Sequence, residues 1–153
     1  MAMGVLVLVI GAHTERLVEA AKRRIGDDHR FLFPRRVITR TDGEGFEVHR
    51  RLTPAQFDML RREGAFALYW TEEGVNFALP ASIEEDLAMG KVVVAAASRA
   101  VLDEAKRHYP RVETVIAQPT DVTQSFVERL ERLALSPLAA QAATFTERLG
   151  PMP

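Results

Sequence analysis

A continuous apolar run near the N-terminus constrains the fold more than any other feature of the sequence. Val5 to Ile10 reads Val-Leu-Val-Leu-Val-Ile, and Gly11 follows it directly. A strand without polar residues is typical of a parallel sheet that helices cover on both faces. The run is too short to cross a bilayer, and it lacks the basic lead-in of a signal peptide. We therefore expect an α/β fold with this strand inside a parallel sheet.

Strand and helix patterns alternate along most of the chain. A helix is expected over 14–25, with Thr14 as its N-cap and Gly26 after its end. This alternation predicts a parallel sheet flanked by helices. Further strands are expected at 31–39, 92–96 and 112–117, and further helices at 81–89, 100–108, 121–135 and 136–149.

Residues 46–79 follow a different pattern. A short strand around Val48 precedes a helix that starts at Thr53-Pro54 and stops at Gly64. Two strands then follow, at 66–70 and 75–79, joined by a turn that contains glycine, which is a hairpin pattern. We interpret this segment as a small β-rich lobe inserted into a single domain that spans residues 1–153.

The composition narrows the class of protein. The chain has 153 residues, a net charge of -1 and 47% hydrophobic residues, which suits one globular domain. It lacks the strongly basic character of a nucleic-acid-binding domain. Because it contains no cysteine, disulfides and thiolate metal sites are excluded. We expect a cytoplasmic protein that binds neither nucleic acid nor membrane.

Several short motifs, each occurring once, are spread over most of residues 5–133 in a characteristic order and spacing. They are Arg36-Val-Ile-Thr39-Arg40, Glu47-Val-His49, Leu52-Thr53, Leu68-Tyr-Trp70, Gly74-Val-Asn-Phe77, Gly90-Lys-Val-Val-Val and Ser98-Arg99.

In these motifs the chain resembles the guanylate-kinase branch of nucleoside-monophosphate kinases, and within it the ribose 1,5-bisphosphate phosphokinases of phosphonate catabolism. The resemblance implies a P-loop-kinase-like sheet whose inserted lobe binds the phosphate acceptor. It also implies an enzyme that uses ATP to make phosphoribosyl pyrophosphate. Leu68 stands where guanylate kinases place the glutamate that reads guanine, so guanine is not expected as the acceptor.

The phosphate loop departs from this family. A P-loop reads G-x-x-x-x-G-K-[ST], and its lysine and hydroxyl bind the phosphates and Mg²⁺. Counted from Gly11, these last three positions hold Arg16, Leu17 and Val18. If the helices are matched instead, the loop is about three residues shorter than the family's. The turn is either an ordinary strand-to-helix connection or a helix N-terminus that still binds one phosphate. In the second case its residues are Gly11, His13, Thr14 and Arg16.

Other donor-side residues of the family are replaced as well. Leu133-Ala134-Leu135 stands where relatives carry a run of lid arginines, and Ala95-Ala96-Ala97 stands where they place polar residues near Mg²⁺. Positive charge around the transferring group is the main catalytic resource in phosphoryl transfer. Efficient transfer is therefore not expected, and no catalytic residue is assigned.

The acceptor side keeps more of the family pattern. By resemblance, Arg36 and Arg40 hold a phosphate of the acceptor, and an arginine fork suits phosphate oxygens. For each such residue, the alternative is an ordinary surface or structural role. The candidate acceptor residues are Arg36, Thr39, Arg40, Glu47, His49 and Arg99.

Three hypotheses about function stay open. The first is a degenerate kinase homologue that binds a phosphorylated ribose or nucleotide, needs no cofactor, and has weak or no phosphotransfer. The second is an active phosphotransferase that uses ATP and Mg²⁺. The third is a non-catalytic partner-binding domain, for which an apolar C-terminal helix at 138–145 is a possible homodimer contact.

Overall fold

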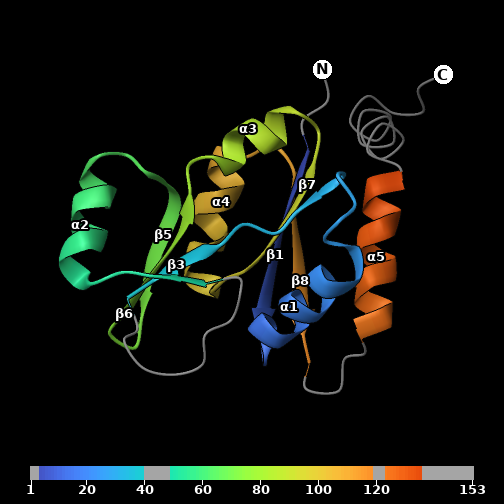
Figure 1. Cartoon of the computed structure of the whole chain (residues 1–153), viewed down its shortest axis with the longest axis horizontal. Helices are drawn as coiled ribbons and strands as arrows, with labels where there is room; N and C mark the ends of the chain where they lie inside the picture. Colours follow the sequence, from blue (N-terminus) through green and yellow to red (C-terminus); the bar gives the residue numbers. More distant parts are fainter. Residues whose placement is uncertain (1–3, 40–48, 119–122, 136–153) are drawn as a thin grey trace.

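The computed structural model of the chain describes residues 4–39, 49–118 and 123–135. Its main sheet has four parallel strands in the order β2-β7-β1-β8 (Figure 1). The strand β1 lies inside it, between β7 and β8, as the apolar run predicts. These strands are β1 (Val5–Gly11), β2 (Phe31–Leu32), β7 (Val92–Ala96) and β8 (Val112–Ala117).

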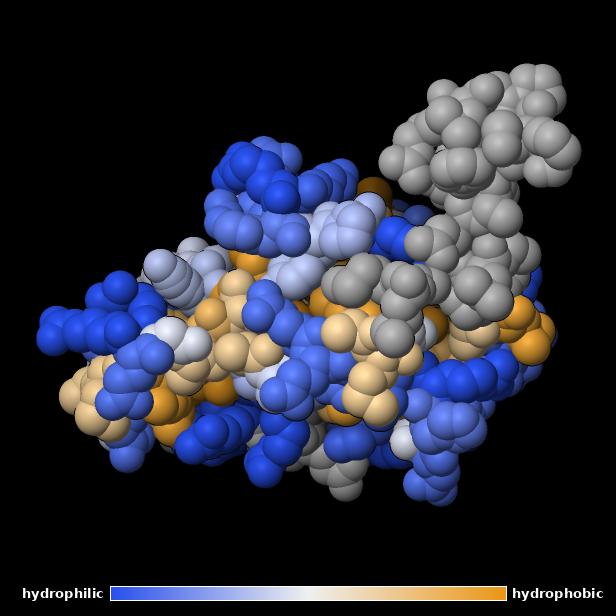
Figure 2. All heavy atoms as spheres, turned by 90° about the horizontal axis from the view of Figure 1, so that it is seen from above, coloured by the Kyte–Doolittle hydropathy of each residue, from blue (hydrophilic) through white to orange (hydrophobic). Residues whose placement is uncertain are grey.

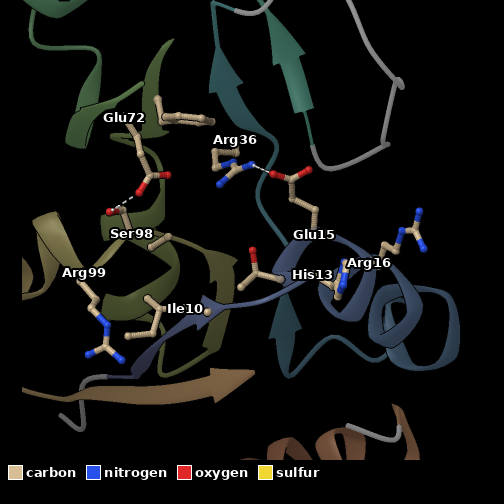
Figure 3. A pocket seen from close by; sticks show the side chains of 12 residues that line it. Ile10, His13, Glu15, Arg16, Arg36, Glu72, Ser98 and Arg99 are labelled. Atoms are coloured by element: carbon tan, nitrogen blue, oxygen red, sulfur yellow. Dashed lines mark hydrogen bonds and ion pairs between the residues drawn. The ribbon is translucent and has the colours of Figure 1, made fainter. Parts of the chain in front are cut away.

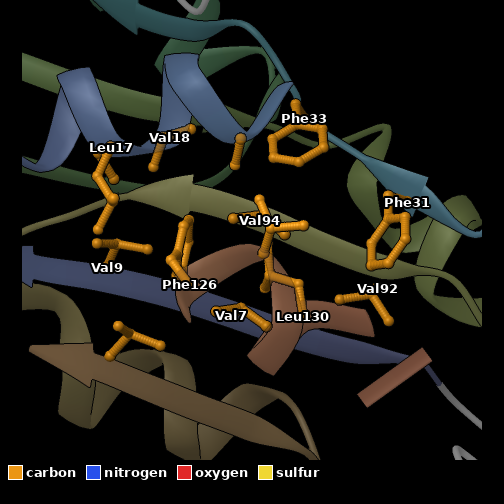
Figure 4. Close-up of a cluster of buried hydrophobic side chains, with 14 of the residues drawn as sticks. Val7, Val9, Leu17, Val18, Phe31, Phe33, Val92, Val94, Phe126 and Leu130 are labelled. Carbon is orange, nitrogen blue, oxygen red and sulfur yellow. The ribbon is translucent and has the colours of Figure 1, made fainter. Parts of the chain in front are cut away.

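Alternate side chains of β1 point to opposite faces of the main sheet. Two helices, α1 (Thr14–Ile25) and α5 (Thr123–Leu135), cover the first of these faces. Val5, Val7 and Val9 pack in one core cluster with side chains of α1 and α5. Figure 4 shows this cluster, with Leu17 and Val18 of α1 and Phe126 and Leu130 of α5 over the strands.

The opposite face carries a second cluster. Leu6 and Leu8 of β1 pack there with side chains of α3 (Ile83–Ala88) and α4 (Leu102–His108). A short 3-10 helix, η1 (Arg99–Val101), leads into α4. Both faces of β1 are therefore buried, as the absence of polar residues in the strand predicts.

A second sheet forms the inserted lobe, with the strand order β4-β3-β6-β5. Trp70, Phe77 and Leu79 of this sheet belong to the same core cluster as Leu6 and Leu8 of the main sheet, so the two sheets share one core. The lobe elements are β3 (Arg36–Ile38), β4 (His49–Arg51), α2 (Pro54–Arg62), β5 (Phe66–Glu72) and β6 (Val75–Pro80).

The hairpin expected over 66–79 is confirmed, since β5 and β6 pair antiparallel. The start of α2 is also confirmed, because Pro54 is its first residue and Thr53 caps it. The Thr53 hydroxyl accepts from the Gln56 N–H at 3.1 Å, and the Gln56 side chain accepts from the Thr53 N–H at 2.9 Å, which is a capping box.

The single strand expected at 31–39 is wrong. The segment forms β2, which pairs with β7, and β3, which pairs with β4 and β6 of the other sheet. Pro34 lies between them and has no N–H for a ladder, so the chain leaves one sheet there and enters the other. The second sheet thus includes β3, which precedes residue 46.

Other boundaries differ from the sequence expectation by a few residues. The helix α3 is shorter than the expected 81–89, and the expected helix at 100–108 begins as the 3-10 helix η1. The strand around Val48 is described only as β4, from His49 onward, and the expected helix at 136–149 lies outside the described residues.

The described surface carries five exposed large hydrophobic side chains, and they come from different elements. In Figure 2, hydrophobic patches on one face are interrupted by hydrophilic side chains. Among the described residues, no helix is long and apolar enough to span a bilayer. The exposed side chains are Met59, Tyr69, Met89, Ile116 and Leu135.

Core packing of α5 gives a first prediction. Leu130 is fully buried whereas Leu135, on the same helix, is 75% exposed. We expect Leu130→Ala to lower the free energy of unfolding by about 2–5 kcal/mol. Leu135→Ala should change it by less than about 0.5 kcal/mol. Urea denaturation of both variants measures this, and equal effects would show that α5 does not pack as described.

Candidate functional site

A cleft of about 540 Å³ opens where β1 and β7 end, between the main sheet and the lobe (Figure 3). Ligands of open parallel sheets bind beyond the carboxyl ends of the strands, so this is the expected place for a site. The cleft is lined by Ile10, Gly11, His13, Thr14, Glu15, Arg16, Arg36, Glu72, Phe77, Ala97, Ser98 and Arg99.

The turn from β1 into α1 forms the floor of this cleft. Gly11 has φ 108°, and a Cβ there would lie 2.6 Å from the Ala117 carbonyl oxygen, so only glycine suits the position. His13 also has positive φ, at 53°, which is uncommon for a residue with a side chain. The turn is therefore tight and conformationally specialised.

The expectation that Thr14 caps α1 is wrong. His13 holds the N-cap position, makes no side-chain capping bond, and leaves Thr14 as the first helical residue. The reason is that His13 has a left-handed backbone conformation, so that the helical conformation begins at the next residue, Thr14. The first N–H groups of a helix lack intrahelical acceptors and attract anions. The N-terminus of α1 thus presents such groups beside the cleft.

Arg36 is the most buried cation of the cleft, with a side chain 6% exposed. Its Nη2 donates to Glu15 Oε1 at 2.7 Å, and its Nη1 donates to the Ala96 carbonyl at 3.3 Å. The guanidinium also lies over the Phe77 ring, 4.7 Å from its centroid, in a cation–π contact. Arg36 is therefore held by α1, β7 and β6 together.

Glu72 and Ser98 join the lobe to the loop after β7. The Ser98 hydroxyl donates to Glu72 Oε2 at 2.9 Å and accepts from the Ala100 N–H at 3.2 Å, at the start of η1. Because Arg99 follows directly, this contact also fixes where the exposed Arg99 side chain begins.

The cleft combines three guanidinium groups, of Arg16, Arg36 and Arg99, with the carboxylates of Glu15 and Glu72. In Figure 3 the three guanidinium groups lie at separate corners. Arg16 extends away from Arg36 on the α1 side, and Arg99 extends away on the opposite side. The lining thus carries an excess of positive charge spread over the cleft.

The structure brings together most of the residues singled out from the sequence. Thr39 is an exception, since its hydroxyl accepts from the Asn76 N–H at 2.9 Å and it is absent from the described lining. Arg40 and Glu47 lie outside the described residues, and His49 is described only as a backbone member of β4. The residues in the cleft are Gly11, His13, Thr14, Arg16, Arg36 and Arg99.

Sequence reasoning missed the two carboxylates. Glu15 follows the β1–α1 turn directly, and Glu72 ends a strand just before the hairpin turn at Gly74. Polar residues where strands end or helices begin are natural candidates for a site at a sheet edge. The location of Glu15 and Glu72 next to predicted turns is therefore the sequence feature by which they could have been found.

Comparison with known proteins identifies the family. No family model matches the sequence. The ribose 1,5-bisphosphate phosphokinase PhnN of Brucella melitensis biotype 2 is 36% identical over 144 residues, which cover 92% of this chain and 75% of that protein. The PhnN of Rhodopseudomonas palustris is 34% identical over 151 residues, or 96% of this chain and 74% of that protein. The chain belongs to the PhnN family.

A solved structure supports the same fold assignment. The guanylate kinase from Anaplasma phagocytophilum superposes with a TM-score of 0.60 at 11% identity, covering 93% of this chain and 74% of that one. The expectation of an α/β, guanylate-kinase-like fold is confirmed.

The residues at the counted P-loop positions can be placed in this structure of a PhnN homologue. Counted from Gly11 without a gap, the positions for lysine and hydroxyl are Leu17 and Val18, which belong to α1 itself and pack in the core. Among the described residues, no group of three or more His, Asp or Glu side chains is arranged to hold a metal.

A second cavity, of about 410 Å³, lies beside the same turn. His13 and Arg16 line both the cavity and the cleft, so the two spaces are neighbours. The cavity is lined by Ala12, His13, Arg16, Leu17, Ala20, Ala117, Gln118 and Thr123.

The tight turn gives a second prediction, with Gly64 as a matched control. Both glycines have positive φ, but nothing lies within 4 Å of a Cβ added at Gly64. We expect Gly64→Ala to cost about 1 kcal/mol from backbone strain alone. Gly11→Ala should cost more, about 2–4 kcal/mol, because strain and the clash with Ala117 combine. Thermal unfolding compares them, and equal losses would contradict the close approach at Gly11.

Proposed function

We propose that this PhnN homologue binds a phosphorylated ribose or nucleotide in the cleft, with transfer of phosphate from ATP weak or lost. The proposal rests on a contrast around the β1–α1 turn, between the phosphate-binding groups that the cleft offers and the P-loop groups that the turn lacks. Arg36, Arg99 and the N-terminus of α1 line the cleft, whereas the turn at residues 11–14 contains no lysine and leads directly into α1.

The cleft has the size and charge for such a ligand. Its volume, about 540 Å³, lies within the range of small-molecule sites, roughly 300–1,000 Å³. Guanidinium groups and a helix N-terminus both favour phosphate oxygens. The separated positions of Arg36 and Arg99 suit a ligand whose phosphate and sugar contact different corners. The names of the relatives, ribose 1,5-bisphosphate phosphokinases, support a ribose phosphate as the ligand class.

The donor side argues against efficient transfer. Ala134 is buried, and Leu133 packs against the core cluster beneath α1 and α5, so neither side chain replaces the arginines expected in a kinase lid. Removing one donor of transition-state stabilisation typically costs about 10²–10³ in rate. Losing the loop lysine together with the lid arginines should therefore leave little transfer.

An active phosphotransferase is the second candidate, and one observation favours it. The cavity of about 410 Å³ adjoins the cleft across His13 and Arg16. A donor in this cavity and an acceptor in the cleft would meet at these two side chains. A partner-binding role is the third candidate, but the apolar helix on which it rests lies outside the described residues.

Binding is tested by calorimetric titration with ribose 5-phosphate. We expect Arg99→Ala to weaken affinity about tenfold or more, because a charge-assisted hydrogen bond contributes about 1.5–3 kcal/mol. Arg62→Ala is the matched control, since Arg62 is exposed on α2 and pairs with Asp58 outside the cleft. No binding by the unaltered protein at millimolar concentration, or equal loss in both variants, would refute the proposed site.

Transfer is tested with ATP, Mg²⁺ and ribose 1,5-bisphosphate. We expect turnover well below about 1 per second, the lower end for working kinases. The Brucella melitensis relative, assayed in parallel, controls for substrate quality. Turnover at or above about 1 per second would favour the active-phosphotransferase candidate and would show that this fold transfers phosphate without a standard loop.

A further inference from the structure

We propose that Glu15 determines the phosphate affinity of the cleft, because its carboxylate occupies the position on Arg36 where a ligand phosphate binds. This inference rests on the proposed function, since it concerns the same cleft and the same arginine. It adds a specificity-determining residue that the family resemblance does not supply.

The geometry of the Arg36 guanidinium leads to this assignment. The Ala96 carbonyl and the Phe77 ring hold it from β7 and β6, and both belong to the buried core. Glu15 is the partner on the cleft side, with a side chain 26% exposed against 6% for Arg36. Figure 3 shows the carboxylate meeting the guanidinium at the cleft. The face of Arg36 toward the cleft is therefore covered by a negatively charged group from the protein itself.

A carboxylate and a phosphate compete for the same face of a guanidinium. Both groups present paired oxygens that accept hydrogen bonds from the arginine fork. The Glu15 carboxylate and a bound phosphate would also repel each other, because both are negatively charged. A phosphate can contact Arg36 on this face only if the Glu15 carboxylate moves away. Phosphate binding is thus an exchange of one anion for another on Arg36. The free energy gained by this exchange is smaller than the free energy that phosphate would gain on a guanidinium without a carboxylate partner.

Glu15 opposes phosphate binding in a second way. It lies in the first turn of α1, where a carboxylate interacts favourably with the helix dipole. The same charge therefore reduces the attraction of both phosphate-binding features, the guanidinium and the helix N-terminus. A neutral side chain of the same shape would leave both available to a ligand.

The exchange is tested with Glu15→Gln, which keeps an oxygen that accepts from Arg36 but removes the charge. Affinity for inorganic phosphate and for ribose 5-phosphate is measured by calorimetry at constant ionic strength. We expect the variant to bind both about tenfold more tightly than the unaltered protein. Asp86→Asn is the matched control, because Asp86 lies in the first turn of α3, is 21% exposed, pairs with Lys91 and is outside the cleft lining, and it should bind as the unaltered protein does.

Thermal unfolding with and without phosphate supplies a second measurement. Removing the Glu15 charge leaves the Arg36 cation without this counter-anion, and bound phosphate restores one. We expect Glu15→Gln to melt at a lower temperature in phosphate-free buffer and to gain more from added phosphate than the unaltered protein. If the variant folds only with phosphate present, the exchange is supported. If it fails to fold in both buffers, Glu15 is a purely structural residue and the inference is overturned.

The calorimetric outcomes separate this inference from the proposed function. If the unaltered protein and the folded variant bind ribose 5-phosphate equally, or the variant binds more weakly, the inference fails while the proposed function stands. If none of the proteins binds phosphate or ribose 5-phosphate at millimolar concentration, the proposed function fails and takes this inference with it.

Discussion

The burial of β1 on both faces is the constraint on which the rest of the molecule depends. Its valines pack beneath α1 and α5, and Leu6 and Leu8 pack with α3, α4 and the lobe. Burial of both faces strongly specifies the register of the strand. The position of the turn at its end, which forms the floor of the cleft, therefore follows from the packing of the core.

Arg36 links the lobe to the main sheet at the edge of the candidate site. It lies at the start of β3 in the lobe sheet, yet its donors reach Glu15 of α1 and Ala96 of β7 in the main sheet. A buried guanidinium is costly unless its partners are well placed. The lobe and the main sheet are thus joined at the cleft by an electrostatic contact as well as by apolar packing. Any ligand that draws Glu15 away acts on the same contact.

Much of the fold follows from local sequence patterns, because those patterns report burial and turn chemistry directly. The apolar run predicts β1, and Thr53-Pro54 predicts the start of α2. The division of 31–39 between two sheets was missed, because apolar residues on both sides of Pro34 look alike whichever sheet they join. In the cleft, the arginines were predicted through the family pattern. Glu15 and Glu72 were not, because their roles depend on contacts with Arg36 and Ser98 from distant segments.

The charges around the β1–α1 turn bear directly on the proposed function. A standard loop would place a lysine beside the phosphates, and its long backbone arc would wrap them. Here the turn passes through Gly11 and His13 straight into α1, and the first turn of that helix carries a carboxylate. The Glu15 carboxylate thus lies at the floor of the cleft, and the guanidinium groups of Arg36 and Arg99 lie on its walls. Under the proposed function, this distribution of charge suits reversible binding of a phosphorylated sugar better than the clamping of a triphosphate, since clamping requires positive charge concentrated at one point.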